Sequence, residues 1–179
     1  MELARREKAT FDEVRRSCEL IEATVPAEFD RVRATADLIR CESFMYEGDK
    51  ERSLEEFTGF ATRHPNRPRE NAMAKIYQGF INGELGNWDE CKSFYEDVMQ
   101  TAPQTPDESF YWAGERWNLR LKAAKALRRY AVKFQDEEAR AQAEDYLAAK
   151  ATPRNISSRT ISRCHTTAAS WPTATSTAM

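Results

Sequence analysis

Apolar residues recur along the chain at the three- and four-residue spacings that are typical of helices. Within residues 2–24 the apolar positions Phe11, Val14, Cys18 and Ile21 form one stripe of a helix. Similar stripes predict helices over 27–46, 53–63, 70–85, 89–99, 110–121, 123–134 and 137–150. We find neither an alternating strand pattern nor an Asn-Gly or Asp-Gly turn between two such strands. The pattern therefore predicts an all-α fold.

Glycine and proline residues divide this helical pattern at regular intervals. Gly48 and Gly86 each precede a polar residue and lie 38 residues apart. Pro65 and Pro103, which end the helices that follow these glycines, are also 38 residues apart. Because the two glycines and the two prolines are separated by the same number of residues, they predict an internal repeat.

The repeated unit resembles the tetratricopeptide repeat: a helix, a Gly-polar turn, a second helix with a central aromatic residue, and a closing proline. The first unit is matched by Phe44, Gly48, Asp49, Phe57 and Pro65, and the second by Gly79, Gly86, Asn87, Tyr95 and Pro103. A third, degenerate unit is suggested by Trp112, Ala113 and Gly114, because Gly114 lies 35 residues after Gly79. The repeat of a second proline three residues after Pro65 and Pro103 is similar to the subset found in bacterial Tol-Pal and outer-membrane assembly proteins.

The resemblance implies a right-handed α-solenoid of about three antiparallel helix pairs, with the first and last helices capping the stack. Small residues at Cys41, Gly79 and Gly114 would let the helices approach closely. We expect this domain to span residues 1–150. Residues 151–179 are mostly Ser, Thr and Ala with no acidic residue, and this composition predicts a disordered tail.

Charge is distributed unevenly between the body of the chain and its tail. Residues 1–149 hold 29 acidic and 23 basic residues, a net charge of -6, whereas residues 150–179 carry +4. An acidic body disfavours nucleic-acid binding, which needs a basic face. No apolar run is long enough to span a membrane, and the first residues contain no apolar signal region, so we expect a cytoplasmic protein.

The residues that usually carry catalysis are sparse. The chain has no phosphate-binding glycine loop, no zinc-protease motif and no serine-nucleophile motif. Its histidines are His64, beside a helix-ending proline, and His165, in the tail. We therefore expect no enzymatic activity, cofactor or metal. The cysteines Cys18, Cys41, Cys91 and Cys164 have no metal-like spacing, and we interpret them as small buried thiols.

The resemblance places the ligand surface on the leading helices of the pairs, which line the concave side of such stacks. The candidate partner-binding residues there are Met45, Tyr46, Ile76, Tyr77, Phe80, Glu84, Tyr111, Trp112 and Glu115. Carboxylates are interspersed at Glu42, Glu84, Glu108 and Glu115, so we expect an apolar or amphipathic partner with basic flanks. Family members that bind acidic chaperone tails use Lys, Asn and Arg on this surface, and the predicted surface has few of them.

The leading hypothesis is a non-enzymatic scaffold that binds a peptide or an amphipathic helix of another protein. The alternative is a structural subunit of a larger assembly, and RNA binding is a third possibility that the acidic body opposes. A binding role requires Tyr77, Phe80 and Trp112 to be partly exposed, whereas Phe57 should lie in the core. The competing interpretation is that these aromatic residues fill the contacts between repeats.

Overall fold

The computed structural model describes residues 2–103, 109–112 and 115–151, and it defines side chains within 10–103 and 118–150. Within these residues the chain forms seven α-helices, one short 3-10 helix and one pair of strands. In chain order they are α1 (Glu2–Thr24), η1 (Ala27–Phe29), α2 (Asp30–Glu47), α3 (Lys50–Arg63), α4 (Pro68–Leu85), α5 (Trp88–Thr101), β1 (Ser109–Trp112), β2 (Glu115–Asn118), α6 (Leu119–Phe134) and α7 (Glu137–Ala151).

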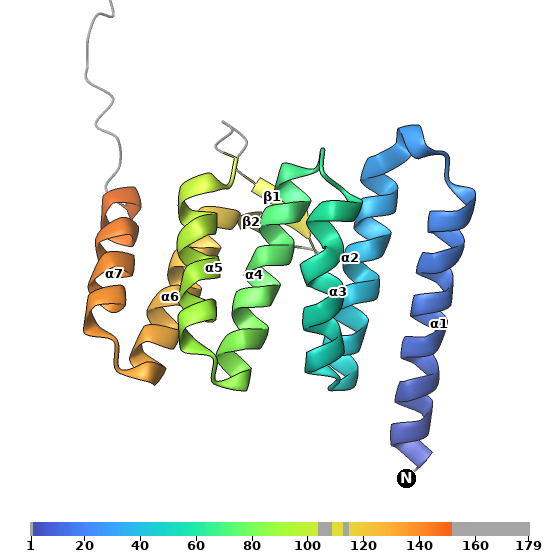
Figure 1. The fold of residues 1–179 in the computed structure, drawn as a ribbon, viewed down its shortest axis with the longest axis horizontal. Coiled ribbons are helices and arrows are strands. Elements are labelled where there is room, and N and C mark those ends of the chain that lie inside the picture. The colour runs from blue at the N-terminus through green and yellow to red at the C-terminus, as the bar shows by residue number, and fades with distance from the viewer. Residues whose placement is uncertain (1, 104–108, 113–114, 152–179) are drawn as a thin grey trace, which may run out of the picture.

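The helices stand in a row and alternate in direction along the chain (Figure 1). Each helix packs against its neighbours in sequence, and α4 also contacts both α2 and α6. This arrangement confirms the predicted all-α class and makes α4 the central helix. No helix in the described part of the chain combines the length and apolar character that crossing a membrane requires.

The turns between paired helices have the predicted Gly-polar character. Gly48 and Gly86 adopt positive φ angles of 99° and 91°, which suit a residue without a Cβ. Asp49 follows Gly48 and accepts a hydrogen bond from the backbone N–H of Arg52, so that it caps α3. The turn between α6 and α7 has the same geometry, although Gln135 takes the left-handed position with φ of 58°. The predicted break between the helices over 123–134 and 137–150 is confirmed, but the sequence pattern did not indicate the left-handed residue because this turn has no glycine.

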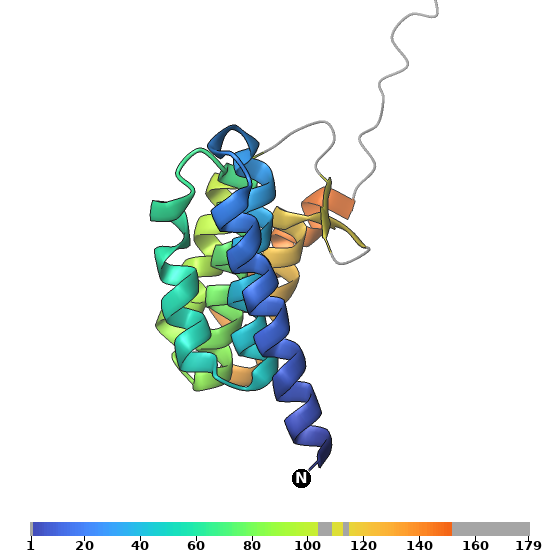
Figure 2. The ribbon, with the colours of Figure 1, turned by 90° about the vertical axis from the view of Figure 1, so that its right-hand side faces the viewer.

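The predicted helix over 110–121 is wrong except for 119–121, which begin α6. Trp112, on which the third repeat was placed, lies in a strand, and Ala113 and Gly114 lie outside the described residues. Residues 109–112 and 115–118 instead form the antiparallel strands β1 and β2, with Trp112 opposite Glu115. Three of the four residues of β1 and one of the four residues of β2 are aromatic, and aromatic residues favour extended structure. The hairpin lies beside α6 and away from α3 (Figure 2). The third helix pair is therefore α6 with α7.

The residues of the hairpin lie between α5 and α6, and they lengthen the interval between the starts of successive helix pairs. The helices α2, α4 and α6 begin at Asp30, Pro68 and Leu119, so the interval grows from 38 to 51 residues. Asn118 ends β2 and caps α6, because its Oδ1 accepts a hydrogen bond of 3.0 Å from the backbone N–H of Leu121. The inserted hairpin thus passes directly into the third helix pair.

Aromatic side chains form the centre of the core. The predicted core residue Phe57 is buried, and its ring stacks on that of Tyr77 with centroids 5.1 Å apart. Tyr95 and Tyr130 are also buried and stack on each other. Cys18, Cys41 and Cys91 are buried free thiols, as predicted, and burial raises the pKa of each. Cys164 and the predicted disordered tail beyond Ala151 lie outside the described residues.

Two glycines of α4 allow aromatic rings to lie directly against its backbone. A Cβ at Gly79 would lie 2.9 Å from the ring of Tyr95, so the small residue has the predicted role within its pair. A Cβ at Gly83 would lie 2.5 Å from Cε1 of Tyr130. Because Tyr130 belongs to α6, Gly83 sets the approach of the second helix pair to the third.

We predict that Gly83→Ala lowers the free energy of unfolding by about 1–2 kcal/mol, because the clash with the buried Tyr130 ring outweighs the gain in helix propensity. Ser93→Ala on the exposed face of α5 is the control, since it places no added atom against a buried ring. Urea unfolding followed by circular dichroism measures both variants. Equal stability of the two variants would show that α4 and α6 are not held at this distance.

Candidate functional site

A groove of about 590 Å³ crosses the face formed by α2, α4 and α6. Its described lining residues come from these three helices and from α5. They are Met45, Tyr46, Ile76, Tyr77, Phe80, Tyr95, Lys122, Lys125, Ala126 and Arg129. The structure therefore brings together five of the nine residues predicted to bind a partner: Met45, Tyr46, Ile76, Tyr77 and Phe80.

The apolar wall of the groove comes from the last turn of α2 and the middle of α4. Tyr46 is 63% exposed, whereas Met45 and Phe80 are half-buried. Ile76 and Phe80 are four residues apart and so share one face of α4. These side chains give the groove an apolar surface that remains open to solvent.

Tyr77 is not an exposed binding residue, which corrects the expectation drawn from the sequence. Its side chain is only 8% exposed, because the ring stacks on Phe57 of α3. Ile76 is buried to a similar degree. Both side chains border the groove, but most of their surface is buried in contacts between helices. For Tyr77, the competing interpretation that the aromatic residue fills a contact between helices is correct.

Glu84, another predicted partner-binding residue, is exposed on α4 and is paired with side chains of α6. Its Oε1 accepts a hydrogen bond of 2.7 Å from the hydroxyl of Tyr130 and lies 3.7 Å from Nζ of Lys133. The hydrogen bond from Tyr130 lowers the pKa of Glu84 despite the opposing effect of burial. This carboxylate therefore stabilises the contact of α4 with α6. It does not belong to the described lining of the groove.

The remaining predicted partner-binding residues belong to the hairpin. Tyr111 and Trp112 lie in β1 and Glu115 lies in β2, so their expected helical positions are wrong. Their side chains lie outside the described part of the structure.

Three basic residues of α6 form the opposite wall of the groove, and the sequence analysis missed them. Lys122, Lys125 and Arg129 follow each other at spacings of three and four residues, which places them on one face. The guanidinium of Arg129 lies 4.7 Å from the centroid of the Tyr130 ring. The signal was present in the sequence, since α6 contains six Lys or Arg residues and no acidic residue. It was missed because the expected binding helix was placed over 110–121.

A buried network of charges joins α2 to α3, away from the groove. Asp37 is 1% exposed and accepts hydrogen bonds of 2.7 Å from Nη2 of Arg40 and from Nε of Arg63. Nε2 of His64 lies 3.1 Å from the same carboxylate. Glu56 pairs with Arg40 at 2.9 Å, so it is a structural partner and not merely a solvated acid. Because its polar atoms are paired, this network is suited to stabilising the fold.

The pKa of Asp37 reports the balance of forces in this network. Burial acts to raise the pKa, but the hydrogen bonds from Arg63 and Arg40 outweigh burial and lower it. Asp37 is therefore a charged carboxylate at neutral pH, and its charge is compensated by two guanidinium groups.

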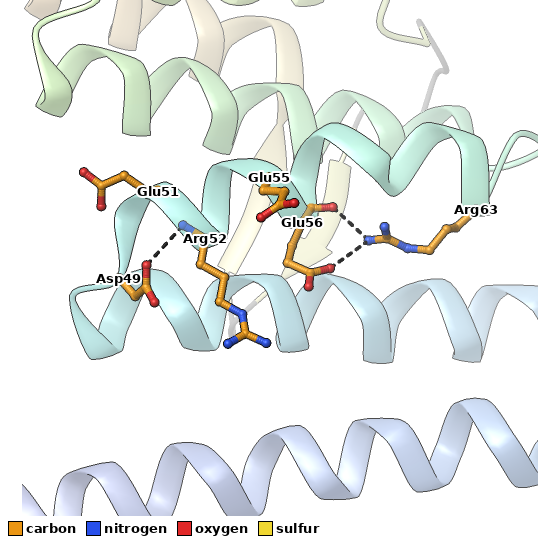
Figure 3. A pocket seen from close by; sticks show the side chains of 6 residues that line it. All are labelled: Asp49, Glu51, Arg52, Glu55, Glu56 and Arg63. Carbon is orange, nitrogen blue, oxygen red and sulfur yellow. Dashed lines mark hydrogen bonds and ion pairs between the residues drawn. The ribbon is translucent and has the colours of Figure 1, made fainter.

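A second surface depression, of about 790 Å³, lies along α3 (Figure 3). All of its described lining residues are charged: Asp49, Glu51, Arg52, Glu55, Glu56 and Arg63. Asp49 caps the helix, and Arg63 donates a hydrogen bond of 2.8 Å to the backbone carbonyl of Glu56 (Figure 3). These interactions make the depression the solvated edge of the Asp37 network. The groove on α2, α4 and α6 is the better candidate site.

Comparison of the chain with protein-family models, with curated proteins and with solved structures finds no match in any of the three.

We predict that Asp37→Asn lowers the free energy of unfolding at pH 7 by about 3–5 kcal/mol, because it removes the buried carboxylate that the guanidinium groups of Arg40 and Arg63 share. The contribution of Asp37 depends on pH because folding lowers its pKa. It is fully present above the unfolded pKa of about 3.9 and is lost as the pH falls through the folded pKa. The difference between the wild type and Asp37→Asn should therefore shrink from pH 7 to about pH 2.

Urea unfolding across this pH range tests the prediction, with Asp145→Asn as the control. Asp145 is exposed on α7, so its substitution should change the free energy of unfolding by less than about 0.5 kcal/mol. An Asp37→Asn variant that is as stable as the control at pH 7 would contradict the role of the network.

Proposed function

We propose that this chain is a non-enzymatic scaffold that holds a segment of another protein in the groove between α2, α4 and α6. The observation that supports the proposal most strongly is an open groove whose apolar wall includes an exposed aromatic residue, Tyr46. Apolar surface that remains accessible after folding is typical of binding sites for peptides and helices. Because the lining comes from α2, α4, α5 and α6, the groove's shape depends on how these four helices pack.

We further propose that the stack is a right-handed solenoid of tetratricopeptide type. The helix pairs α2 with α3, α4 with α5 and α6 with α7 would be its three repeats, with α1 as an N-terminal cap. The shared left-handed residue at Gly48, Gly86 and Gln135 supports this division. So do the contacts of α4 with α2 and α6, which make these three the leading helices.

The chemistry of the groove supports a binding role over a catalytic one. Its described lining contains no carboxylate, histidine, cysteine or serine that could act as a nucleophile or general base. The buried titratable residues of the Asp37 network are paired with one another on another part of the molecule. We therefore propose no reaction for this protein.

A second candidate function is that of a structural subunit within a larger assembly. The observation that favours it is an apolar strip on α2 and the preceding η1, formed by Phe29, Val32 and Ile39. These side chains are 55%, 46% and 38% exposed. A permanent partner that covered this strip as well as the groove would make an obligate interface.

We predict that Tyr46→Ala weakens the binding of a groove ligand by about 2 kcal/mol, or roughly 30-fold in Kd, without lowering stability. The probes are amphipathic helical peptides selected by phage display on the full chain. Leu20→Ala is the matched control, because Leu20 is also 63% exposed but lies on α1, outside the groove lining. Isothermal titration calorimetry compares the Kd values of the three proteins.

Equal effects of Tyr46→Ala and Leu20→Ala on every selected peptide would place the binding surface elsewhere. Light scattering separates the two candidate functions. A scaffold remains monomeric without its ligand, whereas an isolated subunit with a large uncovered interface self-associates.

A further inference from the structure

All of the charged residues in the described lining of the groove are basic. Its described lining contains three basic residues, Lys122, Lys125 and Arg129, and no acidic residue. Lys125 and Arg129 are exposed, and neither forms an ion pair with a carboxylate in the described part of the chain. Glu84 of α4, which lies outside the described lining, accepts a hydrogen bond from the Tyr130 hydroxyl. A chain whose body carries a net charge of -6 thus presents a basic edge at its groove.

A buried hydroxyl group lies beside this basic edge. Tyr95 of α5 lines the groove and is fully buried, and its hydroxyl has no hydrogen-bond partner among the described residues. Burial raises the pKa of Tyr95, and the nearby positive charge of Arg129 opposes that rise. A buried hydroxyl without a partner destabilises a protein by about 1–3 kcal/mol, so it is suited to donate a hydrogen bond to a ligand.

We propose that the groove binds an amphipathic helix whose apolar side chains contact Met45, Tyr46 and Phe80 and whose acidic side chains face α6. One carboxylate of this helix accepts a hydrogen bond from the Tyr95 hydroxyl and pairs with Arg129, and a second pairs with Lys125. This inference rests on the proposed function and specifies the chemistry of the partner. It reverses the charge that the sequence analysis expected, since the flanks are acidic and not basic.

A helix fits this surface better than an extended chain does. The exposed residues Phe29, Val32, Ile39 and Tyr46 follow one another at spacings of three, seven and seven residues, which is a single stripe along α2. The stripe begins at Phe29 in η1, leads into the groove at Tyr46 and extends over 18 residues, or about 25 Å along the helix axis. A partner helix of that length could bury its apolar face along α2 while its acidic edge contacts α6.

The same surface suits a nucleic acid less well. Its wall on α2 and α4 is apolar, and the basic residues lie along one helix only. The acidic body would repel a polyanion that extended beyond the groove. A short acidic helix places only a few carboxylates near α6 and avoids this repulsion.

The experiment uses three synthetic helices of about 18 residues that share one apolar face and differ only in the residues along one edge. These edge residues are all Glu, all Gln or all Lys. We expect the Glu peptide to bind the full chain at least about tenfold more tightly than the Gln peptide, and the Lys peptide to bind most weakly. The preference for Glu should decrease as NaCl rises from about 50 to 500 mM.

Two substitutions locate the contacts. Tyr95→Phe should weaken the Glu peptide several-fold and leave the Gln peptide nearly unchanged, and it should not lower the melting temperature, because it removes a hydroxyl that has no partner. Arg129→Gln should weaken only the Glu peptide. Arg128→Gln is its matched control, since Arg128 is also exposed on α6 but belongs to a different depression, with Leu121 and Leu147.

The outcomes of these experiments distinguish a failure of the inference from a failure of the proposed function. Equal binding of the Glu and Gln peptides, or tighter binding of the Lys peptide, would overturn the inference while the groove remains a peptide site. If the Glu peptide fails to bind at about 1 mM, the inference is wrong, and if the Gln peptide also fails, the proposed function is contradicted as well. Tighter binding of single-stranded poly(U) RNA than of the Glu peptide, with loss on Arg129→Gln, would also overturn the inference in favour of nucleic acid.

Discussion

The contact of the Tyr130 ring with the bare backbone at Gly83 is the constraint on which the rest of the structure depends. It allows α6 to lie directly against α4, and the Tyr130 hydroxyl fixes the contact through its hydrogen bond to Glu84. The ring also stacks on Tyr95 and packs edge-on against Phe80. One side chain thus connects α4, α5 and α6. Without this close approach, the basic residues of α6 would not border the apolar wall formed by α2 and α4.

Stability and recognition are carried by different parts of the molecule. The Asp37 network holds α2 and α3 together through buried ion pairs, whereas the groove lies on the face shared by α2, α4 and α6. Residues such as Tyr77 connect the two, because one edge of the ring faces the groove and its face stacks on Phe57. Exposed residues such as Tyr46 and Lys125 can therefore change with the partner at little cost to the fold.

Much of the fold could be predicted from the sequence, because helical spacing and turn residues are local signals. The helices before residue 103 and the turns at Gly48 and Gly86 follow directly from them. The hairpin at 109–118 was missed because its strands show no alternation of apolar and polar residues. The break between 134 and 137 was predicted, but not the left-handed residue Gln135, because this turn has no glycine. Burial of Tyr77 and the approach of Lys125 and Arg129 depend on how distant helices pack, which periodicity alone does not determine.

The claim that the groove is the interaction surface can be tested by NMR of the methionine methyl groups during titration with the Glu-edged helix. Met45 lines the groove, whereas Met73 and Met99 are buried in the core and serve as internal controls. The account predicts that the Met45 resonance shifts to saturation while those of Met73 and Met99 remain nearly unchanged. Binding of the helix without any change at Met45, or with larger changes at Met73 and Met99, would contradict it.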